Sequence, residues 1–579
     1  MSLSNAAMTV APNLSQVGMQ VGSQDGWVRP RTLRGVLGFL RGYPWLVLPM
    51  ALGSLAWGRL TRNQRIIDDR RALLKLMAKG ADYYCSLFWL FRGFYWTSDP
   101  HRPASFFAIH EDQPATEPRT LKVGSLELAY GSGDFDAPEL RLSWPIRLFY
   151  RLLGSLPRIQ ADNRPLPPIE DYRAMLRDIF GPTFVSYRPI TSDPNDPETV
   201  RAYMTHDYGA PWLRREGERF VADLSHWESL EVVDPSKYER YGGRLEFAAD
   251  LSEVSITWQG VRYTPAHRDW AKVRYIFTST VLLAVVVEQH TVHVHYLNAA
   301  LFGLAVRTDL TPDHPIYRLL RPFTLRTVMI NEHAVHTIIG QSGLLYHGSA
   351  LSWPSLETLY QHAADSYRHE PMPAYLERQG LLEADGAPAP GVAFADESLR
   401  VYGLIDRFVR DYVSLYYADD AAVAADATLA GFWARIVDGL PATAGVAATP
   451  TREGLVDLLA VFIWNVSFWH DYTSQTGNSL GDYRLGAVLL KREDVYGTVM
   501  PNMQEHLVTL LAHQLTTVQG PKVVDNFHHV WLDDEARAVA LRFQQGLWDY
   551  RADLEQRNQG RDLVFNAFDP AVIETSVQT

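Results

Sequence analysis

Three histidines in a strongly apolar segment constrain the fold of this chain more than any other feature. His290, His293 and His295 lie in VVVEQHTVHVHYLN, at the end of an apolar run, 281–287, that is typical of a buried core. A buried imidazole has two ring nitrogens, and both cost desolvation energy unless they are hydrogen-bonded or bound to a metal. The segment therefore predicts a buried helix whose histidines bind a metal or, as the alternative, form hydrogen bonds within the core.

The spacing of the histidines decides which of them share one face. His290 and His293 are three apart, so a regular helix brings them together. His290 and His295 are five apart, and they converge only if the helix is locally widened into a π-bulge, a distortion common at functional sites. A second, weaker signal is His470, with Ser474 one turn later, in the apolar run 455–474. A core histidine beside aromatic residues is the alternative there.

Composition limits the chemistry that such a site can use. The single cysteine, Cys85, excludes intrachain disulfides and cysteine-rich metal sites, so a metal must rest on His, Asn or carboxylate ligands. The net charge of −12 argues against a nucleic-acid-binding protein. We expect a cytoplasmic protein, and membrane association is a further option. The sequence shows no heptad pattern, so it gives no reason to expect an oligomer.

Residues 1–94 are predicted to be a leader and a helical extension. Residues 1–25 lack the basic start and apolar core of a secretory signal. The segment 36–57 is apolar, but an arginine and two prolines interrupt it, so it is not expected to span a membrane. We expect a packed helix there, with peripheral membrane contact as the alternative. The pattern in 59–94 is helical.

Residues 95–579 are expected to form a large, mainly α-helical domain with a few short β-strands. The stretch 95–170 is predicted to be loop-rich with a few short strands, such as 125–130. Two further pieces, 243–248 and 253–261, alternate in period two and predict a small sheet. From Asp269 onward helical patterns dominate. The expected breaks between helices are at Thr311-Pro312, Trp353-Pro354, residues 387–391 and Thr449-Pro450.

Three separated stretches resemble the lipoxygenase family. The first, 290–345, begins HTVHVHYLN and ends HTIIGQSGLL, and is similar to the family's metal-binding helix and the signatures after it. The second, LVDLLAVFIWNVSFWHDYTS at 455–474, is similar to the helix that supplies a third histidine and a weak fourth ligand. The third is DPAVIETSVQT at 569–579, which resembles a family terminus whose last main-chain carboxylate binds iron. The resemblance covers roughly 255–579 and implies the shorter bacterial form, without an N-terminal β-sandwich domain.

The resemblance also implies the members of a metal site. The implied ligands are His290, His295, His470, Ser474 and the main-chain carboxylate of Thr579. This mixed nitrogen and oxygen set suits a non-haem iron with an open position, and manganese is the alternative metal. Ser474 stands where Asn or His is usual, which predicts a weaker or absent fourth protein ligand. His293 is a rival ligand.

For function, the resemblance implies a dioxygenase that inserts O₂ into a polyunsaturated fatty acid to give a hydroperoxide. A metal-bound hydroxide, rather than a side chain, then removes the hydrogen atom. The implied substrate-binding residues are Ile330, Ala334, Ile338 and Leu344. The first three recur every four residues and are expected on one helix face, with plain core packing as the alternative. Two other functions keep the fold: changed chemistry, as in a hydroperoxide isomerase or a tailoring oxygenase, and a metal-free lipid-binding relative.

Overall fold

The computed structural model describes most of the second half of the chain and parts of the first half. The described residues are 47–62, 117–132, 197–207, 209–325, 327–341, 343–474, 486–492, 521–525 and 530–577, with a few single positions between them. Contacts within the chain divide it into two units, Met1–Ser86 and Leu87–Thr579. Each unit is described by itself.

In the first unit the structure describes helix α2, Val47–Leu60. Pro49 lies in its first turn, where no backbone N–H donor is needed, so this proline does not break the helix as the sequence suggested. Arg62 takes a left-handed conformation with a φ of 54°, and α2 ends just before it. The remainder of the predicted helical region includes 36–46 and 75–94, which lie outside the described residues.

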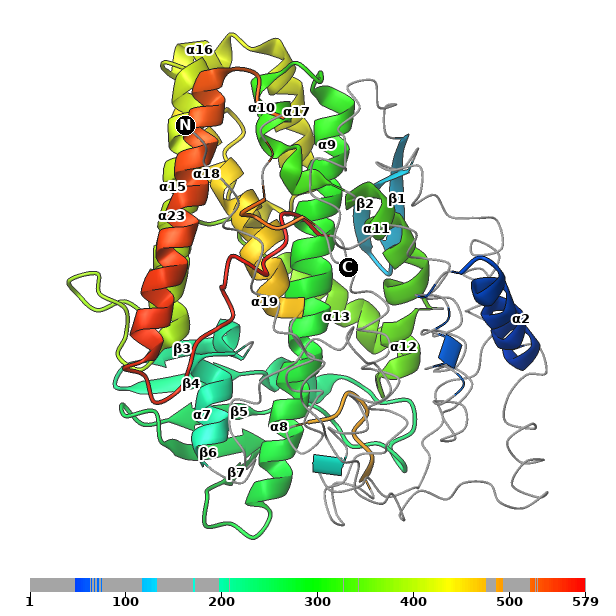
Figure 1. Cartoon of the computed structure of the whole chain (residues 1–579). Coiled ribbons are helices and arrows are strands. Elements are labelled where there is room, and N and C mark those ends of the chain that lie inside the picture. Colours follow the sequence, from blue (N-terminus) through cyan, green and yellow to red (C-terminus); the bar gives the residue numbers. More distant parts are fainter. Residues whose placement is uncertain are drawn as a thin grey trace. The chain divides into compact units, whose positions relative to one another are not determined.

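A long central helix organises the second unit. It consists of α8 (Trp270–Ala284), η7 (Val285–Ala300) and α9 (Leu301–Asp309), which follow one another without a break (Figure 1). By length and composition it is apolar enough to cross a membrane, but 83% of its most apolar window is buried inside the protein. It is therefore the core helix of this domain, as the apolar run in the sequence predicted.

A five-stranded antiparallel sheet lies beside the start of the central helix, where β6 contacts α8. Its strands are, in spatial order, β3 (Leu213–Glu216), β4 (Arg219–Asp223), β5 (Arg244–Phe247), β6 (Glu253–Trp258) and β7 (Val261–Tyr263). The strand predicted at 243–248 corresponds to β5. The single strand predicted at 253–261 is wrong, because Gln259 and Gly260 have φ values of 51° and 73° and turn the chain into β7.

A separate hairpin of β1 (Glu117–Val123) and β2 (Leu126–Ser132) contains the strand predicted at 125–130. Gly124, with a φ of 62°, lies in its two-residue turn, where a left-handed conformation is required. Strand β2 contacts η7 and α11 (Thr327–Ala334). The hairpin therefore packs on the same part of the central helix that carries the histidines.

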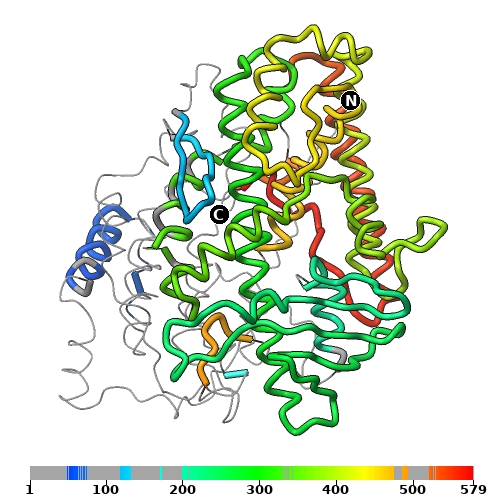
Figure 2. The backbone as a smooth tube through the Cα atoms, turned by 180° about the vertical axis from the view of Figure 1, so that it is seen from behind, coloured from blue at the N-terminus to red at the C-terminus, as the bar shows by residue number. Residues whose placement is uncertain are grey.

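Further helices pack around the central helix and against one another. Helix α15 (Ala393–Tyr416) packs against both α18 (Arg452–Trp464) and α23 (Asp534–Asn558). Figures 1 and 2 both show α15 and α23 running side by side. Glu397 of α15 is fully buried and accepts hydrogen bonds from Arg557 of α23 and from Arg561 just after it. After α23 the chain returns toward the central helix (Figure 1).

The predicted breaks agree with the helix boundaries. Helix α9 ends two residues before Thr311-Pro312, and α13 (Trp353–Ser366) starts at Trp353 with Pro354 in its first turn. The run at 387–391 lies in the loop between α14 (Met372–Arg378) and α15. The mainly helical fold with few strands is confirmed.

Candidate metal centre

A π-helical segment brings His290 and His295 together. The whole of η7 has the wider π-helical turn that the five-residue spacing requires. Two side chains stabilise this turn, since Thr291 donates to the carbonyl of Val286 at 2.7 Å and Asn298 donates to that of His293 at 2.7 Å, both five residues back. As a result the two Nε2 atoms lie 3.0 Å apart.

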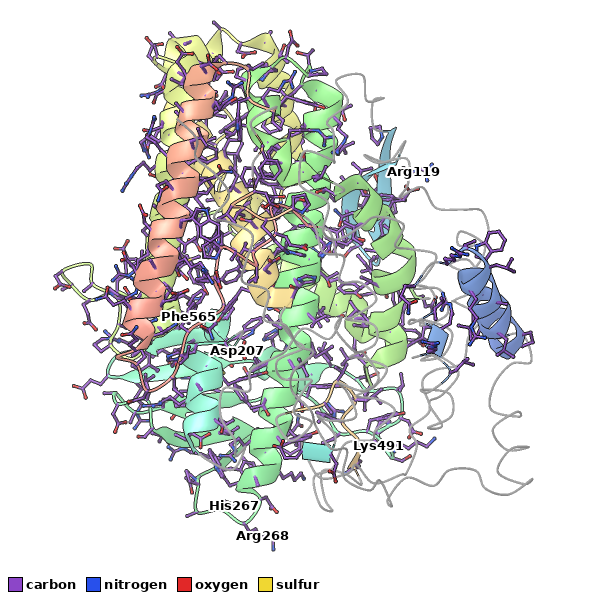
Figure 3. All side chains as sticks on the ribbon, in the orientation of Figure 1. Arg119, Asp207, His267, Arg268, Lys491 and Phe565 are labelled. Carbon is purple, nitrogen blue, oxygen red and sulfur yellow. The ribbon has the colours of Figure 1, made fainter. Side chains whose placement is uncertain are left out.

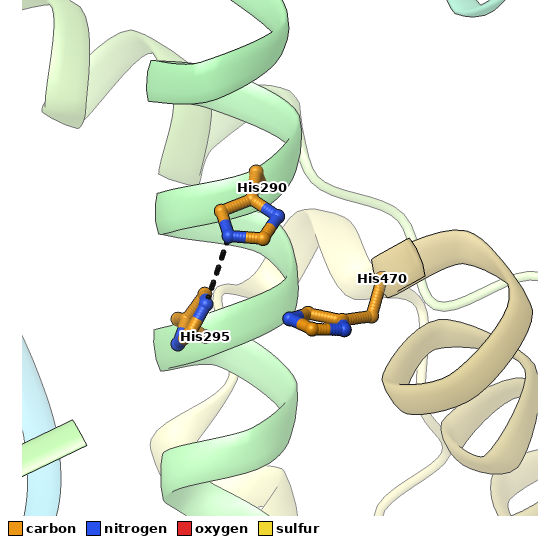
Figure 4. A group of neighbouring side chains, drawn as sticks. All are labelled: His290, His295 and His470. Carbon is orange, nitrogen blue, oxygen red and sulfur yellow. Dashed lines mark hydrogen bonds between the residues drawn. The ribbon is translucent and has the colours of Figure 1, made fainter. Parts of the chain in front are cut away.

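His470 joins this pair from a second helix. It follows a second π-helical segment, η11 (Asn465–Trp469), and is the first residue of α19 (His470–Ser474). Figure 4 shows its ring facing the other two across the gap between the helices. Its ring centroid lies 4.9 Å from that of His290 and 5.5 Å from that of His295. One ring nitrogen of each histidine lies within 4.8 Å of the others.

The opposite ring nitrogens have partners of their own. His295 Nδ1 is 3.0 Å from Asn331 Oδ1, and His470 Nδ1 is 3.0 Å from Asp471 Oδ1. His290 Nδ1 is 3.3 Å from Thr473 Oγ1, whose own proton is directed to a main-chain carbonyl. Acceptors in these places hold a proton on each Nδ1, which leaves the lone pair of each Nε2 for a cation.

Two observations indicate that these three histidines suit a metal ion. His470 Nε2 is buried and has no hydrogen-bond partner among the described residues. His290 Nε2 and His295 Nε2 face each other with no proton between them if both Nδ1 atoms are protonated, so a cation would relieve the repulsion. Metal–nitrogen bonds of about 2.1 Å at right angles place two nitrogens about 3.0 Å apart. The observed separation matches that value.

The C-terminal segment is bonded to this centre through Asp471. Its Oδ2 accepts the backbone N–H of Glu574 at 2.7 Å, while its Oδ1 contacts His470. Ser576 donates to the carbonyl of Leu325 at 2.7 Å, and Val577 is fully buried. The chain thus runs into the core beside the histidines.

Comparison with known proteins supplies the family. The lipoxygenase family model matches residues 259–519. A linoleate 9/13-lipoxygenase of Pseudomonas aeruginosa is 30% identical over 313 residues, which are 50% of this chain and 45% of that protein. Residues 259–519 of the chain therefore form a lipoxygenase-family domain. The human hydroperoxide isomerase ALOXE3 is 26% identical over 336 residues, 54% of this chain and 46% of that protein. These alignments span less than half the length of either curated relative.

The fold agrees with the lipoxygenase assignment. A lipoxygenase crystallised anaerobically with arachidonate superposes with a TM-score of 0.64 at 14% identity, over 80% of this chain and 79% of that one. The three histidines and Ser474 lie within the range that the lipoxygenase family model matches, and Glu574 lies beyond it. The structure therefore adds the bond between Glu574 and Asp471, which the family model does not cover.

Two polar residues implied by the lipoxygenase resemblance are placed differently from the three histidines. Ser474 is half-buried and donates to the carbonyl of Asp471 at 3.1 Å, within its own helix. Thr579 lies outside the described residues. The rival ligand His293 is placed outside the group: its Nε2 lies 2.7 Å from the carbonyl of Ala363. Burial lowers the pKa of His293, which favours a neutral, hydrogen-bonded imidazole.

The substrate-binding residues implied by the lipoxygenase resemblance lie on and after α11. Ile330 and Ala334 are buried on this helix, which contacts η7 and carries Asn331. Ile338 lies in η9 (Val335–Ile339), the π-helical segment that follows α11, and its place on the same face as Ile330 and Ala334 stays a prediction. Leu344 is the first residue of α12 (Leu344–Gly348).

Asn331, Asp471 and Thr473 are the residues of this candidate centre whose roles the sequence did not reveal. They orient the histidine rings without belonging to a motif that carries metal chemistry. Asn331 lies 36 residues from His295 along the chain, so only the packing of α11 on η7 brings them together. The adjacency of Asp471 to His470 was the one available signal.

Proposed function

We propose that this lipoxygenase is a non-haem iron dioxygenase that converts a polyunsaturated fatty acid and O₂ into a fatty acid hydroperoxide. The observation that carries the proposal is the convergence of His290, His295 and His470 with His470 Nε2 buried and unpartnered among the described residues. The reaction adds both oxygen atoms to one C–H position, so it needs no external reductant.

The histidines would hold the iron, with the main-chain carboxylate of Thr579 and the hydroxyl of Ser474 as further ligands. Bound iron supplies the one-electron chemistry that removes a hydrogen atom from a bis-allylic carbon. Asn331, Asp471 and Thr473 keep the Nδ1 protons in place and fix the three ring orientations. The iron's surroundings are therefore set before substrate binds.

The substrate class rests on the relatives and on the apolar lining. Relatives of this chain include a linoleate lipoxygenase and a lipoxygenase crystallised with arachidonate. Ile330 and Ala334 present buried apolar surface on α11, next to the helix that carries His290 and His295. Apolar walls of this kind suit a flexible hydrocarbon chain.

Metal content tests the proposal directly. We expect near-stoichiometric iron in the full chain by mass spectrometry, and loss of most of it in His470→Ala. The matched control is His293→Gln, which alters a histidine of the same helix that lies outside the group and should keep its iron. A variant without Gln578 and Thr579 should lose iron if the terminal carboxylate is a ligand. A full chain without iron after reconstitution would contradict the proposal.

Activity decides between the dioxygenase and one alternative. The similarity to the hydroperoxide isomerase ALOXE3 favours isomerisation of a fatty acid hydroperoxide as the second candidate. With linoleate, a dioxygenase should consume O₂ and produce conjugated-diene absorbance. If iron is present and only added linoleate hydroperoxide is consumed, without O₂ uptake, the isomerase is the correct function and the dioxygenase proposal fails.

A further inference from the structure

A second cluster of possible metal ligands lies on the other side of η7. His226 comes from the short helix η6 (Ser225–Ser229), Glu288 from η7 and His362 from α13. One ligand atom of each lies within 4.8 Å of the others. The rings of His226 and His362 have centroids 4.3 Å apart at 31°. Three elements far apart in the sequence thus direct two imidazoles and a carboxylate to one point.

The carboxylate of Glu288 is buried, with only 2% of its surface exposed. Its Oε1 accepts from the indole of Trp227 at 2.7 Å and lies 3.0 Å from His226 Nε2. Within the described part of the chain, no lysine or arginine forms an ion pair with Glu288. A buried carboxylate is costly unless a cation or several donors compensate it, and the described residues supply only two donors here.

His362 offers an accessible imidazole to this cluster. Its side chain is exposed, and it forms no hydrogen bond with the residues that the structure describes. Its ring nevertheless lies against His226, and α13 packs on η7 through neighbouring residues such as Ala363. The backbone that carries His362 is therefore fixed, while its ring nitrogens remain available.

Two imidazoles and one glutamate are a ligand set that Zn²⁺ uses with an open fourth position. Bonds of about 2.0–2.1 Å at tetrahedral angles separate the ligand atoms by about 3.3 Å. The distance between His226 Nε2 and Glu288 Oε1 is already 3.0 Å, and small side-chain rotations bring His362 to the same point. Imidazole-rich sites also favour Zn²⁺ over Mg²⁺ or Ca²⁺.

The fourth position would open on a cavity. Glu288, His226 and His362 all line a cavity of about 470 Å³, which none of the three histidines of the candidate iron centre lines. Glu288 is two residues before His290, and residues two apart on a helix do not share a face. The two clusters therefore occupy different sides of η7.

We propose that His226, Glu288 and His362 form a second metal site, which binds Zn²⁺ and joins η6 and α13 to the middle of η7. The open coordination position faces the cavity and takes water or an anionic ligand. The site is independent of the proposed dioxygenase function. Because it is built on the helix that carries His290 and His295, bound Zn²⁺ also stabilises the π-helical turns around them.

The experiment is a titration of the iron-loaded protein with Zn²⁺ in competition with a chromogenic zinc chelator, with iron content measured before and after. We expect one equivalent of tightly bound Zn²⁺ while iron remains constant. In His362→Ala the affinity should fall about tenfold or more, because one ligand is lost. His362 is exposed and makes no hydrogen bond to the described residues, so this variant is expected to fold.

Two further variants complete the test. His226→Gln should also weaken Zn²⁺ binding while keeping a donor for Glu288. The matched control is His267→Ala, since His267 is an exposed histidine in the turn before α8, well away from η7 (Figure 3). Zn²⁺ affinity that is unchanged in His362→Ala, or equally weakened in His267→Ala, would overturn the proposal. If the first centre lacks iron, it would take up Zn²⁺ as a further equivalent that His362→Ala does not remove.

Discussion

At the scale of single residues, the centre depends on what fixes each imidazole as much as on the imidazoles themselves. Asn331 shows this best. Its amide nitrogen donates to the carbonyl of Thr327 at 2.9 Å, which directs its oxygen toward His295 Nδ1. The ring of His295 is therefore held by an amide whose own orientation is fixed by α11.

The first prediction concerns this amide. Asn331→Ala should lower iron affinity about 10- to 100-fold, the usual effect of removing a hydrogen-bond partner from a metal-bound histidine. Asn331→Asp is the matched control, because it keeps an acceptor for His295 and should retain more of the affinity. Iron retention during dialysis against a chelator measures both. Equal iron loss in the two variants would show that the hydrogen bond to His295 does not matter.

The sequence allowed the three histidines to be predicted but not their partners. The apolar run makes the buried imidazoles conspicuous, but the choice of His290 and His295 over His293 came from the resemblance to lipoxygenases, with a π-helical turn as the condition for their meeting. Thr473 and Asn331 could not be chosen, since hydroxyl and amide side chains occur throughout the chain. Glu288, which follows three valines, gave no sign that His226 and His362 would reach it.

At the scale of elements, the change from α-helix to π-helix and back is what positions the site. The turn after η9 depends on Gly343, where a Cβ atom would lie 2.2 Å from the carbonyl oxygen of Ile338. No side chain fits at that distance without movement of the backbone. Thr-Pro and Trp-Pro pairs predicted most helix boundaries. The turn between β6 and β7 was missed because Gln259 is not a residue typical of positive φ.

The second prediction uses two glycines with opposite surroundings. Gly343→Ala should destabilise the protein by about 2 kcal/mol or more, because the backbone around η9 and α12 must shift. Gly403→Ala is the control: it lies within α15 with nothing near the added methyl group, and should stabilise by about 0.5–1 kcal/mol. Urea denaturation of both variants measures the difference. Equal stability of the two would contradict the close contact at Gly343.

At the scale of the whole second unit, a buried glutamate with two arginine partners connects the helices that close the fold. Glu397 is fully buried on α15, and Arg557 and Arg561 bond to it from the end of α23. Burial alone would raise the pKa of Glu397, but the hydrogen bonds from the two arginines outweigh it and hold the pKa below its ordinary value of 4.5. The folded state therefore binds this proton less tightly than the unfolded state.

The third prediction follows from the lowered pKa of Glu397. The stabilisation from Glu397 is complete above pH 4.5 and is lost as the pH falls through the lower pKa of the folded state. Glu397→Gln should cost about 3 kcal/mol at pH 7, and its stability should fall less steeply below pH 4.5. Glu453→Gln, which breaks a more exposed pair with Arg410, should cost about 1 kcal/mol or less. Thermal denaturation between pH 3 and pH 7 measures all three proteins, and parallel curves for wild type and Glu397→Gln would refute the assignment.

The bond between Asp471 and Glu574 has a consequence for how the protein is made. The two residues are 103 positions apart, and the same carboxylate contacts His470. While the ribosome still holds residues after Asp471, this carboxylate has no main-chain donor from Glu574. If the proposed iron centre needs this contact, a nascent chain stalled before Glu574 should retain less iron than the full chain.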